Sequence, residues 1–70
     1  MKHYILVDSQ GWVSNFLDHS LEDATKRATG LLEFSSFRES LYIDIYEVCI
    51  DCDSILICTT VYKNGEVRER

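Results

Sequence analysis

Two runs of β-branched and aromatic residues in the second half of the sequence constrain the fold more than any other feature. They span residues 42–50 and 55–62, and isoleucine, valine and tyrosine recur in both. Such residues fit the pleated, half-buried surface of a sheet. The polar residues 51–53 separate the two runs, so we expect a β-hairpin in which these three residues form the loop.

This loop fixes the register of the hairpin and the face on which each side chain lies. With residues 51–53 as the loop, Val48 faces Leu56 and Tyr46 faces Cys58. Successive side chains of a strand point to opposite faces. One face therefore collects Ile43, Ile45, Cys49, Ile55, Ile57 and Val61. The opposite face carries Tyr42, Asp44, Tyr46, Val48, Ile50, Leu56 and Tyr62. Glu47 falls on the apolar face, which indicates a position beyond the edge of a covering helix or a β-bulge.

The N-terminal segment predicts a second, shorter hairpin. Residues 4–8 form an apolar run, and the connection at residues 9–11 ends in Gly11. A three-residue loop that closes on glycine is typical of a hairpin with a type I turn and a bulge. We expect the returning strand to extend from Trp12 to Phe16.

One helix is predicted to follow this hairpin. Ser20 is a favourable N-cap, and Asp23 completes the S-x-x-[DE] capping pattern. Apolar residues then recur at helical spacing. They are Leu21, Ala24, Ala28, Leu31 and Leu32. We expect the helix to end near Phe34, with a loop up to Ser40.

Together these segments predict an α+β fold of the order ββαββ, with a four-stranded antiparallel sheet and one helix packed on one face. The chain has 70 residues and no proline- or glycine-rich linker, so we expect a single domain over residues 1–70. A single helix covers only one side of such a sheet. The other side would present Tyr42, Tyr46 and Tyr62, and an exposed aromatic surface of this kind is typical of binding patches.

The charge distribution predicts the kind of partner. The chain carries 12 acidic and 7 basic residues, a net charge of −5. Between Glu39 and Tyr62 there is no Lys or Arg, and five acids lie there: Glu39, Asp44, Glu47, Asp51 and Asp53. Such a segment repels phosphate backbones and attracts basic surfaces. We therefore expect no direct contact with nucleic acid and a protein partner whose surface is basic.

The cysteines do not indicate a metal centre or redox chemistry. Cys49, Cys52 and Cys58 supply three thiols, whereas a structural zinc site needs four converging ligands. In the predicted register Cys49 and Cys58 also point to opposite faces. The neighbouring aspartates disfavour the low thiol pKa that thioredoxin-type catalysis requires. We expect these side chains to pack as small apolar groups, and we predict no catalytic residue, cofactor or metal ligand.

The expected location is the cytoplasm. The apolar run at residues 4–7 is shorter than the core of a signal peptide. No run approaches the ~20 apolar residues needed to cross a bilayer. An odd number of closely spaced cysteines differs from the disulfide framework of small secreted domains. We therefore expect a reducing compartment and no membrane association.

Two resemblances extend this interpretation. The segment YILVDSQGWVSNFLDHSLEDATKRATGLLE resembles the hairpin-then-helix of HicB-type antitoxins, whose capped helix reads roughly T-x-E-E-A. The residues that match are Ser20, Glu22, Asp23 and Ala24. The whole chain also looks like small acidic bacteriophage proteins that begin M-K-x-Y-I-L-V-D and later carry I-Y-E-V, here at residues 45–48. That resemblance implies a host-takeover or anti-defence protein that blocks a host enzyme or nucleic-acid-binding complex by occupying its surface.

The sequence thus predicts a non-enzymatic inhibitor that binds a host protein in the host cytoplasm. The residues expected to carry the contact are Tyr42, Asp44, Tyr46, Asp51, Asp53 and Tyr62. One alternative is a symmetric homodimer through the tyrosine-bearing face. Another is a dimer that sequesters a small ligand or signalling nucleotide, which requires basic residues to converge from Lys26, Arg27, Arg38 and Lys63.

Overall fold

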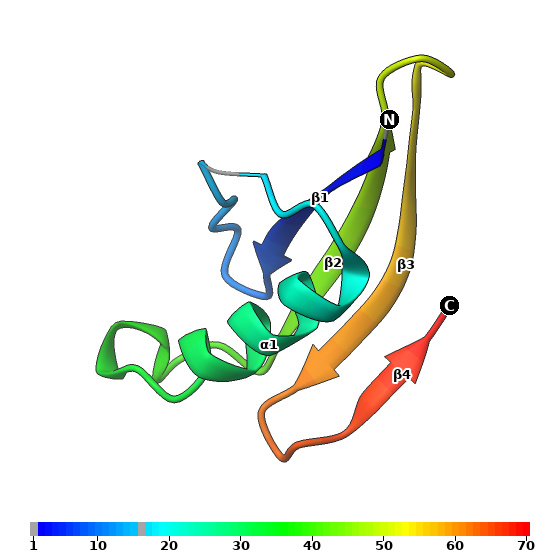
Figure 1. Ribbon diagram of the computed structural model, residues 1–70. Helices are drawn as coiled ribbons and strands as arrows, with labels where there is room; N and C mark the ends of the chain where they lie inside the picture. Colours follow the sequence, from blue (N-terminus) through cyan, green and yellow to red (C-terminus); the bar gives the residue numbers. More distant parts are fainter. Residues whose placement is uncertain (1, 16) are drawn as a thin grey trace.

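The computed structural model describes residues 2–15 and 17–70. Along the chain they form β1 (Lys2–Asp8), α1 (Leu21–Leu31), the 3-10 turn η1 (Ser35–Phe37), β2 (Tyr42–Cys49), β3 (Ser54–Tyr62) and β4 (Val67–Glu69). The strands make one antiparallel sheet in the order β1-β2-β3-β4, and α1 lies against one of its faces (Figure 1). The predicted α+β fold with a four-stranded antiparallel sheet and a single helix is confirmed.

The segment expected to form the second strand runs beside β1 without becoming a strand. Isolated bridges join it to β1. Between them, the Leu6 N–H donates to the side-chain oxygen of Ser14 (3.0 Å). A side chain that takes a main-chain hydrogen bond interrupts the regular ladder. The predicted strand from Trp12 to Phe16 is therefore wrong for its described part, and Phe16 itself lies outside the described residues.

The fourth strand is instead β4, so the elements follow the order βαβββ rather than ββαββ. A tight turn after β3 makes this possible: Gly65 adopts φ +96° and its N–H donates to the Tyr62 carbonyl (3.0 Å). Glycine enters this left-handed region without the steric cost that a Cβ brings. β4 then pairs with β3 between Thr59 and Val61.

The helix begins where its cap predicts. Ser20 Oγ accepts the Asp23 N–H (3.1 Å), which satisfies one of the free donors of the first turn. The regular helix ends at Leu31, before the predicted end at Phe34. The chain continues from there in a tighter turn, in which the Phe34 N–H donates to the Leu31 carbonyl (3.0 Å).

The β2–β3 hairpin has two registers, and only one of them was predicted. Tyr42 to Ile45 pair with Tyr62 to Thr59 as expected. A β-bulge between Ile45 and Tyr46 then shifts the pairing, so that Tyr46 faces Ile57 and Val48 faces Ile55. Cys58 is the extra residue of the bulge. The predicted pairs of Val48 with Leu56 and of Tyr46 with Cys58 are therefore wrong by one position.

A one-residue shift moves every side chain of the shifted segment to the other face. The core cluster lies between α1 and the part of the sheet that keeps the predicted register. Its members are Leu6, Ala24, Ala28, Leu32, Ile43, Ile45 and Val61. Ile55 and Ile57, which we expected beside them, are exposed instead.

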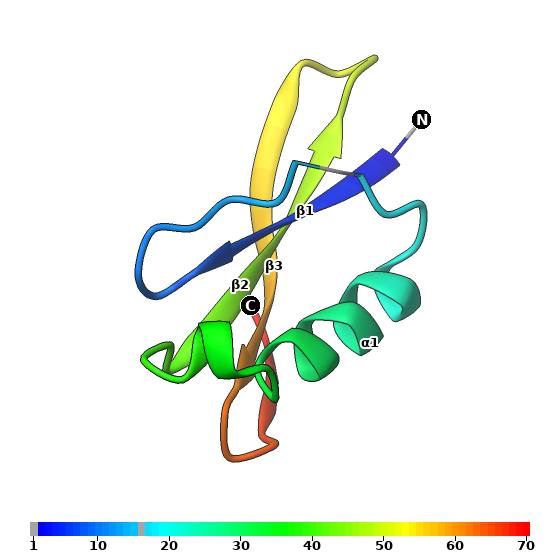
Figure 2. The ribbon, with the colours of Figure 1, turned by 90° about the vertical axis from the view of Figure 1, so that its left-hand side faces the viewer.

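The far end of the β2–β3 hairpin projects beyond α1 and β4, whereas β1 stays paired with β2 as far as Cys49 (Figures 1 and 2). The molecule is correspondingly elongated, with principal extents of 36 × 22 × 17 Å. In the described parts of the chain, no helix combines the length and the apolar character needed to span a bilayer.

Candidate protein-binding surface

The sheet face turned away from α1 carries four of the six predicted contact residues. Ile43 and Ile45 of β2 lie in the core cluster, so the alternate residues of that strand point to the other side. We call this side the uncovered face. Its β2 and β3 members are Tyr42, Asp44, Tyr46, Val48, Ile55, Ile57, Thr60 and Tyr62. The structure thus brings Tyr42, Asp44, Tyr46 and Tyr62 onto one surface, as the alternation predicted.

Two of these tyrosines form a pair across the strands. Tyr42 and Tyr62 are register partners, and their ring centroids lie 6.0 Å apart at an interplanar angle of 58°. The Arg68 guanidinium lies 5.6 Å from the Tyr62 ring centroid, a cation–π arrangement. Both rings are half-buried. They offer flat, partly pre-ordered aromatic area next to one positive charge.

Asp44 lies on the same face but is engaged within the sheet. The Thr60 hydroxyl donates to Asp44 Oδ1 (2.6 Å), and Arg70 Nε donates to the same hydroxyl (3.0 Å). Thr60 is fully buried. Asp44 therefore stabilises β2 against β3, and any contact with a partner would use its remaining acceptor positions.

Aliphatic side chains are exposed at the far end of the hairpin; exposure was predicted for Ile50 and Leu56, but not for Ile55 and Ile57. We call these residues the distal patch: Ile55 and Ile57 lie on the uncovered face, Leu56 faces Glu47 on the α1 side, and Ile50 lies in the turn. The exposed fractions of Ile55, Leu56 and Ile57 are 63%, 61% and 37%. Consecutive exposed aliphatics on a strand are uncommon in monomeric proteins and mark interaction sites or aggregation hazards.

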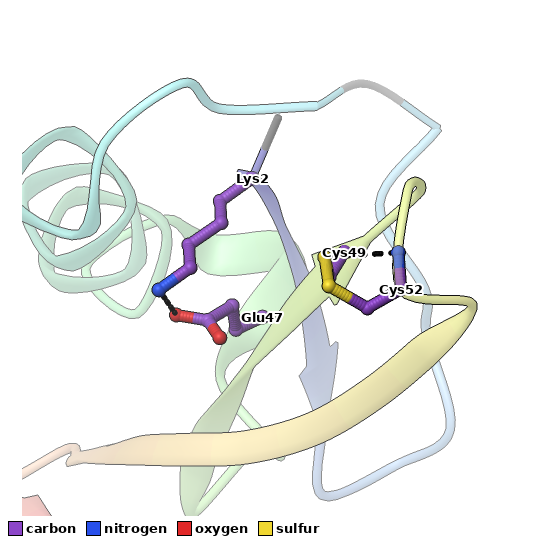
Figure 3. The surroundings of a disulfide bond; sticks show 4 residues. All are labelled: Lys2, Glu47, Cys49 and Cys52. Carbon is purple, nitrogen blue, oxygen red and sulfur yellow. Dashed lines mark hydrogen bonds and ion pairs between the residues drawn. A yellow bond between two sulfur atoms is a disulfide. The ribbon is translucent and has the colours of Figure 1, made fainter.

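The tip of the hairpin is closed by a disulfide between Cys49 and Cys52 (Figure 3). The Cys52 N–H also donates to Cys49 Sγ (3.2 Å). Asp53 adopts φ +54°, a left-handed conformation that Asp tolerates better than most residues. The predicted contact residues Asp51 and Asp53 are both exposed in this turn. The expectation that all the cysteines pack as small apolar groups is therefore wrong for this pair.

Cys58 remains a free thiol, and its position also differs from the prediction. It packs against the core cluster on the α1 side of the sheet, the side to which Cys49 also points. The expectation that these two cysteines face opposite ways fails because the bulge inserts Cys58 as an extra residue. Burial raises the pKa of the Cys58 thiol. A thiol in such a place is protonated at neutral pH and a poor nucleophile.

Glu47 also lies on the α1 side, close to the bulge. Lys2 Nζ lies 3.6 Å from its carboxylate (Figure 3), and the Tyr4 hydroxyl donates to it (3.5 Å). Burial and then the Glu47 charge raise the pKa of Tyr4. Glu47 therefore stays on the α1 side, in the part of the hairpin beyond the helix, which is the first of the two expected positions; the bulge does not move it, because the extra residue lies in β3.

The two histidines lie in contact, and no pattern in the sequence predicts this pair. The ring centroids of His3 and His19 lie 5.3 Å apart in a T-shaped arrangement. His3 is buried. Over residues 2–15 and 17–70, no group of three or more His, Cys, Asp or Glu side chains is arranged to hold a metal ion.

The basic residues required for a phosphate-bearing ligand are each engaged with a different partner. Lys26 lies 3.7 Å from Glu22, Arg27 donates to Asp18 (3.0 Å) and Arg38 lies 3.9 Å from Glu39. Lys63 donates to the carbonyls of Phe37 and Arg38. This arrangement gives the ligand-sequestering alternative no support.

A shallow hollow lies between the loop after β1 and η1. It is lined by Asp8, Gln10, Trp12, Ser36, Phe37, Glu39 and Ser40. The carboxylate of Asp8 already accepts hydrogen bonds from the Ser40 hydroxyl (2.5 Å) and the Trp12 N–H (2.6 Å). Asp8 therefore fixes the loop, and it has little remaining capacity to hold a ligand.

No family model matches the chain, and neither does any of the curated proteins or solved structures with which it was compared. The uncovered face and the hairpin tip are thus characterised by their own chemistry: paired tyrosines, exposed aliphatics and an acidic, disulfide-closed turn.

Proposed function

We propose that this chain is a non-enzymatic protein-binding module that acts by covering a surface of its partner. The observation that carries the proposal is that α1 packs on one side of the sheet, while the other side presents Tyr42, Tyr46 and Tyr62. Tyrosine supplies large contact area with few rotatable bonds, and it is enriched among the residues that dominate interface energies. The uncovered face is the docking surface in this proposal.

The chemistry of the partner follows from the charges at the hairpin tip. Asp51 and Asp53 are exposed there, and the hairpin between Tyr42 and Tyr62 contains no basic residue. A basic protein surface complements this field, which accelerates encounter and makes association sensitive to salt. Direct binding to a phosphate backbone is disfavoured for the same reason.

The specific form of the proposal is a phage-type inhibitor of a host protein. It rests on the likeness of the chain to small acidic phage proteins, and the mode of action is occlusion of a functional surface. The partner in this form is a bacterial enzyme or nucleic-acid-binding complex with a basic surface.

The test has two stages. The tagged chain is first used to capture partners from a bacterial lysate, and each candidate is then purified and titrated by calorimetry. Tyr46→Ala and Tyr42→Ala should each weaken binding by about 10- to 100-fold, which corresponds to about 1.4–2.8 kcal/mol. Asp51→Lys should slow association and reduce its salt dependence.

Phe34→Ala is the matched control, because Phe34 is an exposed aromatic residue outside the sheet. It should leave the affinity unchanged. Unchanged affinity in Tyr46→Ala and Asp51→Lys, or an equal loss in Phe34→Ala, would show that the uncovered face and the hairpin tip do not carry the contact.

A further inference from the structure

The outer edge of β3 is only partly occupied by β4. The two strands pair from Thr59 to Val61, and the Arg70 N–H donates to the Cys58 carbonyl (2.9 Å). β3 itself begins at Ser54. Within the described residues, the edge of β3 from residue 54 to residue 57 therefore has no neighbouring strand. We call these four residues the open edge.

The hydrogen-bonding pattern shows which main-chain groups the open edge presents. In an antiparallel sheet, both main-chain groups of a residue point to one side, and successive residues alternate. Tyr4 of β1 exchanges both bonds with Asp18, away from β2. Its register partner Glu47 must then bond toward β3, where it faces Leu56. The N–H and C=O groups of Ile55 and Ile57 consequently point outward.

Natural edge strands are protected by lysine, proline, inward charges, bulges, shortness or a covering element. The open edge has no lysine, proline, inward charge or covering element; its protection is limited to its shortness and to the bulge at Cys58, next to Ile57. Here the side chains are Ser54, Ile55, Leu56 and Ile57, and the three aliphatics are exposed. Unpaired main-chain donors and acceptors beside exposed aliphatic side chains are what an added β-strand requires.

We propose that the open edge binds a second copy of this chain, with the two β3 strands antiparallel across a two-fold axis. Leu56 then lies opposite Leu56 of the second copy. Ile55 lies opposite Ile57 of the second copy, and by symmetry Ile57 lies opposite Ile55 of the second copy. In this register Ile55 and Ile57, whose main-chain groups point outward, lie opposite each other. Each of the two Ile55–Ile57 pairs therefore exchanges two main-chain hydrogen bonds.

Charge complementarity favours a second copy as the occupant. Asp51 and Asp53 lie in the turn before Ser54, at one end of the open edge, whereas Arg70 lies beside Cys58 at the other end. Antiparallel pairing brings the acidic turn of each copy against Arg70 of the other, so the ion pairing occurs twice. In this register Ser54 of the second copy takes the position opposite Cys58 that Arg70 occupies, so Arg70 must give up its hydrogen bond to the Cys58 carbonyl when the copies pair. The new ladder is therefore limited to residues 55–57, and the affinity is reversible and modest.

The pairing has a geometric consequence for the whole molecule. Antiparallel neighbours in one sheet are related by an axis perpendicular to the sheet, so both copies of α1 lie on the same side. Both uncovered faces then lie together on the opposite side. The dimer would present two tyrosine-bearing surfaces in one plane, which permits bivalent binding.

Analytical ultracentrifugation of the purified full chain tests this proposal without any partner. Over a concentration series from about 1 µM to about 1 mM, sedimentation should report a monomer–dimer equilibrium. Leu56→Lys places two ammonium groups opposite each other at the axis and should raise the dissociation constant at least about tenfold. Leu41→Lys is the matched control, because Leu41 is 68% exposed and lies outside the open edge. It should leave the equilibrium unchanged.

A charge exchange tests the direction of pairing. Arg70→Glu should weaken the dimer, and Asp51→Arg added to Arg70→Glu should recover part of the loss. Far-ultraviolet circular dichroism and urea midpoints establish that each variant is folded. A monomer at all concentrations, an equal effect of Leu41→Lys, association lost through Tyr46→Lys but not Leu56→Lys, or no recovery in the exchanged variant would overturn the proposal.

Discussion

The two halves of the β2–β3 hairpin differ in almost every physical respect, although the same two strands form both. In the near half, residues 42–45 pair with residues 59–62, and α1 buries one face. In the far half, residues 46–49 pair with residues 54–57, beyond the helix, and the aliphatic side chains of β3 are exposed. The bulge at Cys58 separates the two halves.

This difference shows that one half of a hairpin can stabilise the fold while the other half is available to bind a partner. The near half buries Ile43, Ile45 and Val61 almost completely, and it therefore contributes most of the apolar stabilisation of the sheet. The far half retains the strand hydrogen bonds but, apart from Cys49, contributes little apolar burial. A segment of this kind is free to use its side chains for a partner, because the fold depends on them only weakly.

The largest expected effect comes from shortening equivalent aliphatic side chains in the two halves. Ile45→Ala in the near half should lower the free energy of unfolding by about 2–5 kcal/mol, because it leaves a cavity beneath α1. Ile55→Ala in the far half should change it by less than about 0.5 kcal/mol. Urea denaturation followed by circular dichroism measures both values.

Similar losses in the two variants would remove the distinction between the halves. The comparison is best made at low protein concentration, where association through the open edge contributes least to stability. Val61→Ala offers a second near-half variant, since Val61 is 1% exposed and lies in the same cluster.

The disulfide is expected to slow local opening in the far half of the hairpin alone. Cys49 and Cys52 are three positions apart, so the bond closes a very small loop. The loop-entropy relation for so short a loop gives a stabilisation of at most about 2 kcal/mol. Reduction, or the variant Cys49→Ser with Cys52→Ser, should therefore lower the free energy of unfolding by that amount or less. Amide exchange should accelerate at residues 50–55 and stay unchanged at Ile43 and Ile45.

Equal acceleration of exchange in both halves would mean that the hairpin opens as one cooperative unit. Cys58→Ser is the control for the loss of a cysteine elsewhere, because Cys58 lies outside the disulfide. It should leave amide exchange at the hairpin tip unchanged.

The near half could be predicted from the sequence, whereas in the far half only the faces of the β2 residues could. Alternation placed Ile43, Ile45 and Val61 on the helix side correctly because burial on one face specifies the register. In the far half, both faces of β3 are apolar, and no alternation distinguishes a three-residue loop from a four-residue one. The position of Tyr46 opposite Ile57 therefore depended on the bulge, and Glu47, which indicated either a bulge or the edge of the helix, did not locate it.

The two errors at the sheet edges have a common physical origin. The apolar Trp12 and Val13 indicated a strand, but Ser14 takes a main-chain hydrogen bond and breaks the ladder. Conversely, β4 is short, polar and exposed, so its residues carry little strand preference. Its signal was the Asn64-Gly65 pair, a strong hairpin-turn sequence. Edge strands depend on turns and local hydrogen bonds more than on apolar pattern.

The predicted contact residues were found as far as strand alternation reached. Strand β2 continues without interruption, and β3 keeps the predicted register from Thr59 to Tyr62, on the C-terminal side of the bulge. One face therefore carries Tyr42, Asp44, Tyr46 and Tyr62. Half of the distal patch was missed because Ile55 and Ile57 were assigned to the core, whereas Ile50 and Leu56 were expected to be exposed. Three successive aliphatics next to a loop were a usable signal, since a short helix that begins at Leu21 cannot reach both ends of a long hairpin.

The smallest expected effect concerns Cys58, at the junction of the two halves. Burial raises its pKa above the ordinary value of about 8.5, so the folded chain holds the proton more tightly than the unfolded chain does. The contribution of this thiol to the free energy of unfolding is fully present below the pKa of Cys58 in the unfolded chain. It is lost as pH rises through the pKa of Cys58 in the folded chain. Alkylation of Cys58 by iodoacetamide at about pH 8.5 should therefore be slower in the folded chain than in urea, with the disulfide intact. Rates that are equal in the two states across about pH 7–10 would show that the junction opens freely. The near half would then not be closed at the bulge, and the division between the two halves would lie elsewhere along β3.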